Sequence, residues 1–105
     1  MKAIENLIGK KIIIRSDRAG VFYGTLNEVE SCGDKYTVEL INVRRLWYWD
    51  GAASLTQLAM EGVNAPQNCK FTVWQDSIVI CGVIEILPTT ENARKIIEAV
   101  VPWKR

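Results

Sequence analysis

The sequence contains no histidine, which removes the side chain that most often acts as a general base near neutral pH. Its glycines do not form a phosphate-binding loop or a dinucleotide fingerprint. The three cysteines, Cys32, Cys69 and Cys81, lie far apart without a Cys-x-x-Cys pair, so we interpret them as buried or incidental thiols. We therefore expect a protein that is not an enzyme and that uses neither a metal nor a cofactor.

A strong charge bias and long apolar runs are also lacking. The formal net charge is +1, from 13 basic and 12 acidic residues. Proteins that capture nucleic acid by charge usually carry a marked basic excess, so only a local basic site stays open. The longest apolar runs are short, as in Ile12–Ile14, and the first residues do not resemble a signal peptide. We expect a cytoplasmic protein without a membrane-spanning segment.

Length and composition favour one folded unit. The chain has 105 residues, of which 49% are hydrophobic, and we expect a single domain over residues 1–105. A chain of this length buries roughly 60–70% of its unfolded surface, which is enough for an independent core. It is also small enough to gain useful buried area from self-association.

The first half of the chain has the sequence features of β-strands. Segments rich in β-branched residues and separated by glycine-containing turns predict strands over residues 7–15, 21–30 and 35–43. Gly24 inside the second segment predicts a bulge or a sharp bend. The pattern Gly20-Val21-Phe22-Tyr23-Gly24-Thr25-Leu26 resembles the second strand of Sm-like proteins. This resemblance implies a small antiparallel SH3-like or Sm-like β-barrel, or a curled sheet.

The second half begins with a short helix. Ser54 is followed three residues later by Gln57, which is the pattern of a capping box, and Gly62 is a typical helix end. These signals predict a helix over residues 54–61. Further strands are predicted over residues 70–74 and 77–81, with a turn at residues 75–76 between them.

The last part of the chain adds a strand and a helix. Residues 83–87 predict a strand that Pro88 ends. Thr89 or Thr90 is expected to cap a final helix. One face of this helix is apolar and consists of Ala93, Ile96, Ile97 and Val100. The predicted fold class is therefore α+β, with a short central helix and a C-terminal helix.

Residues 44–55 contain the densest concentration of recognition chemistry, with two arginines, three consecutive aromatic rings and a helix start. In a strand, Trp47 and Trp49 point to one face, and Tyr48 points to the other together with Leu46. One of these faces belongs to the core, and the other is exposed or interfacial. The candidate ligand-binding residues are Arg44, Arg45, Trp47, Tyr48, Trp49, Ala53 and Ser54.

These side chains suit a nucleotide ligand. A ring of Trp47 or Trp49 can stack on a nucleobase, which contributes about 1–3 kcal/mol per base. Arg44 or Arg45 can hold a phosphate, and the backbone amides of residues 53–55 at the helix start also favour an anion. In the alternative interpretation the tryptophans pack the sheet against the short helix, and the arginines are solvated or paired with carboxylates.

The sequence of residues 44–59, Arg-Arg-Leu-Trp-Tyr-Trp-x-Gly-Ala-Ala-Ser-Leu-x-Gln-Leu-Ala, resembles a signature of small proteins of phages and bacterial mobile elements. The similarity runs from residues 7–11 through residues 70–73 to Trp103 and Lys104. A phage origin implies a counter-defence factor, an inhibitor or a virion part. In size and chemistry the chain is similar to phage sponge proteins, which are oligomers that sequester nucleotide immune signals.

Three hypotheses remain open at this point. The first is a homo-oligomer that binds and sequesters a cyclic or modified nucleotide, in which Tyr48 bonds ribose or base and Ser54 completes the site. The second is a protein-interaction module that inhibits a host defence protein, since tryptophan, tyrosine and arginine are enriched at binding hot spots. The third is a small barrel that binds nucleic acid, against which the near-neutral net charge counts.

Overall fold

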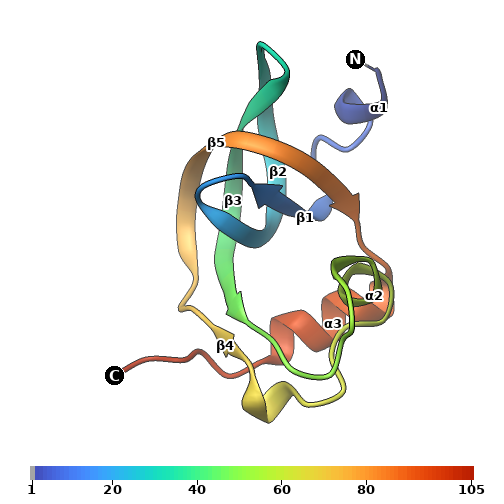
Figure 1. Ribbon diagram of the computed structural model, residues 1–105, viewed down its shortest axis with the longest axis vertical. Helices are drawn as coiled ribbons and strands as arrows, with labels where there is room; N and C mark the ends of the chain where they lie inside the picture. Colours follow the sequence, from blue (N-terminus) through green and yellow to red (C-terminus); the bar gives the residue numbers. More distant parts are fainter. Residues whose placement is uncertain (1) are drawn as a thin grey trace.

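The computed structural model describes residues 2–105 as a mostly antiparallel five-stranded sheet with three α-helices (Figure 1). The strands are β1 (Lys11–Ser16), β2 (Gly20–Cys32), β3 (Lys35–Tyr48), β4 (Lys70–Phe71) and β5 (Gln75–Pro88). The helices are α1 (Lys2–Glu5), α2 (Leu55–Glu61) and α3 (Glu91–Ala99), and a 3-10 turn spans Pro66–Asn68. No helix in this described part of the chain has the length and apolar character that crossing a membrane requires.

The strands follow one another in the order β2-β1-β5-β3-β4, and β2 additionally pairs with β3. β2 and β3 form a long hairpin in which the pairing shifts register between Tyr23 and Thr25. At the shift, β3 places Asn42 and Val43 opposite Gly24 alone, so the irregularity predicted at Gly24 is confirmed. A Cβ atom at Gly24 would lie 3.0 Å from Cβ of Val43, which explains why glycine fits there.

Two hydrophobic clusters cover both faces of β1. Ile13 packs with Leu58 of α2 and Ile97 of α3, whereas Ile12 and Ile14 belong to a second cluster formed mainly by the strands. Successive side chains of a strand point to opposite faces, so three consecutive isoleucines are all buried only where both faces are covered. The apolar run of β1 is thus explained by the position of this strand between two cores.

Helices α2 and α3 both begin at the N-caps that the sequence predicts. The Ser54 hydroxyl accepts a hydrogen bond from the Gln57 amide at 3.1 Å, and Gly62 ends α2 with φ 77°. The Thr90 hydroxyl accepts from the Ala93 amide at 3.1 Å at the start of α3. Thr90 also donates its hydroxyl to the carbonyl of Met60, which holds α2 and α3 side by side (Figure 1).

Two of the predicted strand boundaries are wrong. The strand expected at residues 7–15 begins only at Lys11, because the preceding residues form turns in which the Leu7 and Ile8 amides bond carbonyls of α1. The strand expected at residues 70–74 is limited to Lys70–Phe71. The Thr72 amide still bonds the Arg45 carbonyl of β3 at 3.0 Å, but the Thr72 carbonyl accepts from the Arg44 side chain.

The turn expected at residues 75–76 and the separate strands at residues 77–81 and 83–87 are also wrong. These residues form the single strand β5, which arches across the sheet in Figure 1. β5 pairs with β3 over its first part and with β1 over its second part. Gly82 lies near this change of partner with φ 68°, a value that glycine adopts without steric cost.

Arg44 is fully buried and joins three parts of the fold. Its guanidinium donates to the carbonyls of Ile97 and Val100 at the end of α3, at 3.1 Å and 2.9 Å. It also donates to the carbonyls of Thr72 at 3.0 Å and Phe71 at 3.3 Å. Burial lowers the pKa of Arg44. The cation therefore satisfies carbonyls at a helix C-terminus and at the end of β4.

We predict that Arg44→Met lowers the free energy of unfolding by about 3 kcal/mol, because four backbone carbonyls lose their hydrogen bonds from the guanidinium. Urea unfolding followed by circular dichroism measures this change. Arg45→Met is the matched control, since Arg45 is exposed, and its effect is expected within about 0.5 kcal/mol. Equal stability of the two variants would contradict the structural role of Arg44.

Candidate functional site

The two adjacent arginines of the predicted site point in different directions. Arg44 has no exposed surface, so it does not reach a ligand in solvent and we remove it from the candidate set. Arg45 is exposed, and its guanidinium lies 4.7 Å from the centre of the Phe22 ring. Arg45 lines a cavity of about 460 Å³ together with Arg18 and Lys35. Opposite faces of β3 therefore carry the two side chains.

The three central rings are divided as well. Trp47 and Tyr48 are 59% and 48% exposed, whereas Trp49 is half-buried and packs against the cluster that contains Leu58. The expectation that Trp47 and Trp49 share a face is wrong, because β3 ends at Tyr48 and the chain turns before Gly51. For Trp49 the packing interpretation is confirmed, since it contacts the core that includes α2.

Ala53 and Ser54 serve the start of α2. The Ala53 amide donates to the side-chain carbonyl of Gln57 at 2.8 Å, and the Ser54 hydroxyl accepts from the Gln57 amide. Both residues are exposed, but these polar groups already have partners within the chain. Binding of an anion by the Ala53 amide or the Ser54 hydroxyl would therefore displace the helix cap.

A different set of residues joins the exposed rings. The rings of Trp47 and Trp103 stack in parallel, with centres 5.3 Å apart and an interplanar angle of 2°. The ammonium of Lys70 lies 5.2 Å, 6.0 Å and 5.3 Å from the ring centres of Trp47, Tyr48 and Trp103. The Arg105 guanidinium lies 5.9 Å from the Trp103 ring. We call Trp47, Tyr48, Lys70, Trp103 and Arg105 the aromatic surface.

Pairing of β3 with β4 and docking of the C-terminal segment build the aromatic surface. Tyr48 pairs with Lys70 across the two strands. The Trp103 amide donates to the Phe71 carbonyl at 2.8 Å, which holds the C-terminal segment beside β4 (Figure 1). Trp103 thereby anchors this segment to the body of the domain. Its part in the surface, and that of Lys70, were not predicted, because both lie far from residues 44–55 in sequence.

The aromatic surface combines flat rings with a cation that keeps its hydrogen-bonding capacity. A lysine over exposed rings gains about 0.5–1 kcal/mol from each favourable cation–π contact. None of the ion pairs found within residues 2–105 involves Lys70, so its ammonium is available to an anion from solvent. Chemically, this surface can stack on a planar ring and contact a phosphate or carboxylate beside it.

Comparison with known proteins assigns the chain to a family. Residues 9–97 match the family described as Domain of unknown function (DUF6948). The chain belongs to this family. The matched region includes Arg44, Trp47, Tyr48 and Lys70, while Trp103 lies beyond it. No curated protein and no solved structure matches the chain significantly.

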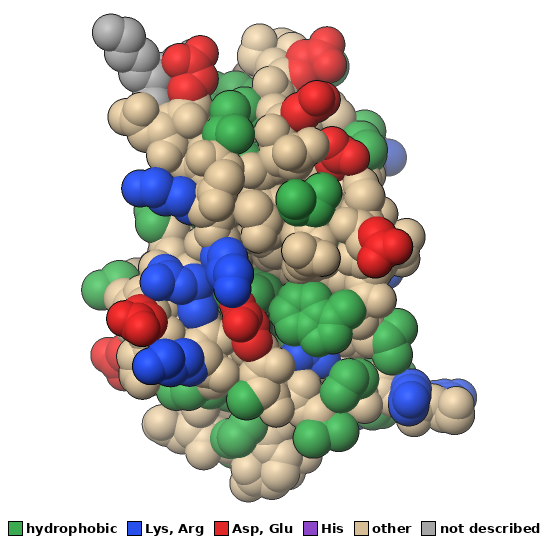
Figure 2. Space-filling model, turned by 180° about the vertical axis from the view of Figure 1, so that it is seen from behind, with side chains coloured by type: hydrophobic (Ala, Val, Ile, Leu, Met, Phe, Trp, Pro, Cys, Tyr) green, Lys and Arg blue, Asp and Glu red, His purple; other side chains and the backbone are tan. Residues whose placement is uncertain are grey.

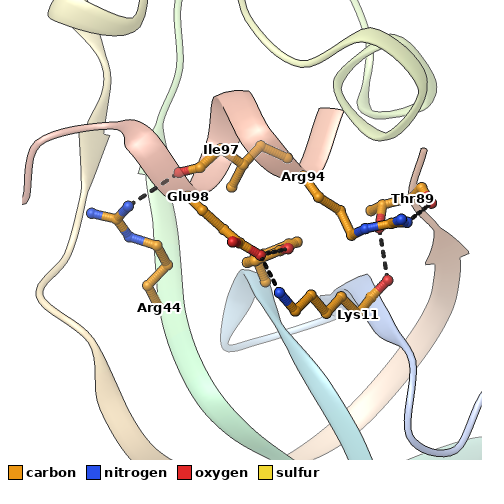
Figure 3. A network of polar contacts seen from close by, with 7 residues as sticks. Lys11, Arg44, Thr89, Arg94, Ile97 and Glu98 are labelled. Carbon is orange, nitrogen blue, oxygen red and sulfur yellow. Dashed lines mark hydrogen bonds and ion pairs between the residues drawn. The ribbon is translucent and has the colours of Figure 1, made fainter. Parts of the chain in front are cut away.

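A second polar cluster of this DUF6948 domain lies between β1, β2 and α3 (Figure 3). The Tyr23 hydroxyl donates to Oε2 of Glu98 at 2.5 Å, and the Lys11 ammonium donates to the same oxygen at 2.9 Å. Arg94 lies nearby and donates to the Thr89 carbonyl. On the face shown in Figure 2, acidic and basic side chains lie together beside a large exposed hydrophobic side chain.

The cluster shifts the pKa values of its members in opposite directions. Burial and the contact with the Glu98 carboxylate raise the pKa of Tyr23 well above its usual range. Burial acts to raise the pKa of Glu98, but the hydrogen bonds from Tyr23 and Lys11 outweigh it, and the pKa is lowered. Tyr23 therefore stays protonated and Glu98 stays ionised near neutral pH.

We predict that Tyr23→Phe reduces the loss of stability at alkaline pH. The unfolded chain releases the tyrosine proton near its usual pKa of 10.0, while folded Tyr23 retains it, so the wild-type free energy of unfolding falls as pH rises above this value. Phenylalanine removes this contribution. The difference between the two proteins is measured by urea unfolding from pH 8 to pH 11.

Tyr36→Phe is the matched control, because this half-buried tyrosine of β3 makes no contact with Glu98 among the described hydrogen bonds. It should leave the alkaline slope unchanged. At the acid end, the lowered pKa of Glu98 stabilises the fold above the usual carboxyl range, and this stability is lost as pH falls through the folded pKa. An unchanged alkaline slope in Tyr23→Phe would contradict the assignment.

Proposed function

We propose that the protein binds a nucleotide through the aromatic surface and does so without catalysis. The observation that supports this function is the parallel Trp47–Trp103 stack with the Lys70 ammonium beside both rings. Every nucleobase has a flat π-face that stacks on tryptophan, and every nucleotide carries a phosphate that a lysine can contact. Two exposed rings and one available cation match these two parts of the ligand.

Each residue of the surface has a separate role in this proposal. Trp47, as the most exposed ring, stacks on the base, and Trp103 supports it from the other side. Lys70 contacts phosphate, the role first expected of Arg44 or Arg45. The Tyr48 hydroxyl bonds ribose or base. Arg105 adds a second positive charge beside the phosphate.

An open surface of this kind encloses little of a small ligand by itself. Small-molecule sites usually cover most of the ligand, so we propose that a second copy of the chain provides the opposite wall in a homo-oligomer. The resemblance of residues 44–59 to small phage and mobile-element proteins supports a counter-defence role. In that role the protein sequesters a cyclic or modified nucleotide signal in the cytoplasm of the host.

The strand pairings support a finer description of the fold. β1 pairs with β2, β2 with β3, β3 with β5, and β5 again with β1. This cyclic sequence of pairings is typical of a small closed barrel, and the bend at Gly82 and the bulge opposite Gly24 favour strong curvature. We propose that the strands form an SH3-like or Sm-like barrel with α2 and α3 packed at one end.

Binding of a host protein is the second candidate function. Val101 is 80% exposed and Val73 is 50% exposed, and both lie close in sequence to residues that contact Trp103 or Arg44. Exposed apolar side chains beside tryptophan, tyrosine and basic residues are typical of protein-binding hot spots. In this case the same aromatic surface contacts a host defence protein instead of a nucleotide.

A ligand panel tests the nucleotide proposal. We expect one of the cyclic dinucleotides, cyclic trinucleotides or ADP-ribose derivatives to raise Tm by several degrees, since saturation at a hundred times Kd adds about 2.7 kcal/mol. Trp47→Ala and Lys70→Ala should weaken binding of that ligand. For Trp47→Ala, which removes the stacking ring, Kd should rise roughly 5- to 150-fold. Differential scanning fluorimetry and calorimetry measure the two effects.

The controls are an exposed tryptophan and an exposed lysine outside the aromatic surface, Trp74→Ala and Lys10→Ala, which should bind the ligand as wild type does. Light scattering with and without ligand measures the oligomer. A panel without any shift, together with a host protein that is captured by wild type and lost in Trp47→Ala, would favour the second candidate. Equal ligand affinity of Trp47→Ala and wild type would exclude the proposed site.

A further inference from the structure

A cavity of about 320 Å³ lies next to the Tyr23–Glu98 cluster. Its lining includes Trp74, Asn42, Gln75, Asp76 and Glu98, so β3, β5, α3 and the segment before β5 all contribute. We propose that this cavity binds a neutral sugar ring, such as the end of a glycan. The proposal does not depend on the nucleotide-binding function, because the cavity lining contains no residue of the aromatic surface.

Trp74 forms a rigid wall of the cavity. It is 41% exposed, yet the Arg44 guanidinium lies 4.8 Å from its ring centre and the Tyr23 ring packs against it edge-on at 6.2 Å. Arg44 is itself held by four carbonyl bonds. The ring is therefore positioned before any ligand arrives, which reduces the ordering cost of binding. A partly exposed, fixed tryptophan suits the flat C–H face of a sugar.

A backbone irregularity brings Asn42 to the cavity. Asn42 has φ 49° and is the only non-glycine residue within 2–105 with a positive φ. It lies in the extra length of β3 opposite Gly24, and between the β5 pairs Ile41–Ser77 and Val43–Gln75. Asparagine tolerates this conformation better than most residues, and bulges of this kind often direct a side chain into a site. Asn42 thereby lines the cavity together with Gln75 and Asp76.

Glu98 adds an acceptor that the protein itself does not use fully. Its Oε2 receives both the Tyr23 hydroxyl and the Lys11 ammonium, as Figure 3 shows. Oε1 has no hydrogen-bond partner among the described contacts of residues 2–105. Because Oε2 is fixed by two donors, Oε1 is held in one orientation and is open to a ligand hydroxyl.

The chemistry of the lining selects the ligand class. Among the charged side chains that line the cavity, two are carboxylates, Glu98 and Asp76, and one is a cation, Lys11, which is already paired with Glu98. A phosphate or carboxylate ligand is disfavoured by this balance of charge. Hydroxyl groups donate to carboxylates, and they both donate to and accept from the amides of Asn42 and Gln75. The cavity is at the small end for ligand sites, which fits a short glycan end.

The proposal is tested by incubating the fluorescently labelled full chain on an array of neutral oligosaccharides. The array includes conjugates of maltose, cellobiose, lactose and diacetylchitobiose. We expect at least one neutral glycan to be retained. Trp74→Ala and Asp76→Asn should each raise its Kd by roughly tenfold or more in a titration with the free sugar. Quenching of tryptophan fluorescence by the sugar should be absent in Trp74→Phe.

Asn42→Gly separates binding from folding. Glycine adopts a positive φ without strain, so Tm should be equal to or above that of wild type, while loss of the amide weakens sugar binding. Trp47→Ala is the control and should bind the sugar as wild type does, whatever happens to nucleotide binding. The proposal is overturned if the array retains no neutral glycan, if only charged glycans bind, or if Asn42→Gly and Asp76→Asn leave Kd unchanged.

Discussion

The hydrogen bonds of one buried guanidinium hold the parts of this domain together. Arg44 of β3 donates to two carbonyls at the end of α3, to the Phe71 carbonyl at the end of β4 and to the Thr72 carbonyl just after it. A buried cation without these acceptors would cost several kcal/mol, so the helix end and the segment must lie where they do. The same guanidinium lies over Phe71 and Trp74 and orders both rings.

The two surfaces that we assign to ligands both depend on this arrangement. The Phe71 carbonyl accepts from the Arg44 guanidinium and also from the Trp103 amide, and this contact helps to hold the Trp103 ring against Trp47. The Trp74 ring contacts the Arg44 guanidinium and forms a wall of the cavity near Glu98. The buried Arg44 thereby positions Trp74 and Trp103, two tryptophans that are exposed to solvent.

Local structure was predictable where the chemistry is local. The caps of α2 and α3 depend on Ser54, Gln57 and Thr90, whose partners lie within three residues or so, and the irregularity at Gly24 follows from a missing side chain. The predicted α+β class agrees with the five strands and three helices that are observed. Strand limits were less predictable, because residues 70–88 change partners through contacts with β3, β1 and Arg44.

The sequence by itself therefore determined the caps of α2 and α3 and the irregularity at Gly24, since each depends on neighbouring residues. Only the tertiary structure decided that Arg44 is buried while Arg45 is exposed. Arg44 and Arg45 are the same residue type and adjacent in sequence, but the carbonyls that accept from Arg44 lie from 27 to 56 residues away. Long-range pairing, which no local pattern encodes, therefore determines which of the two arginines is buried.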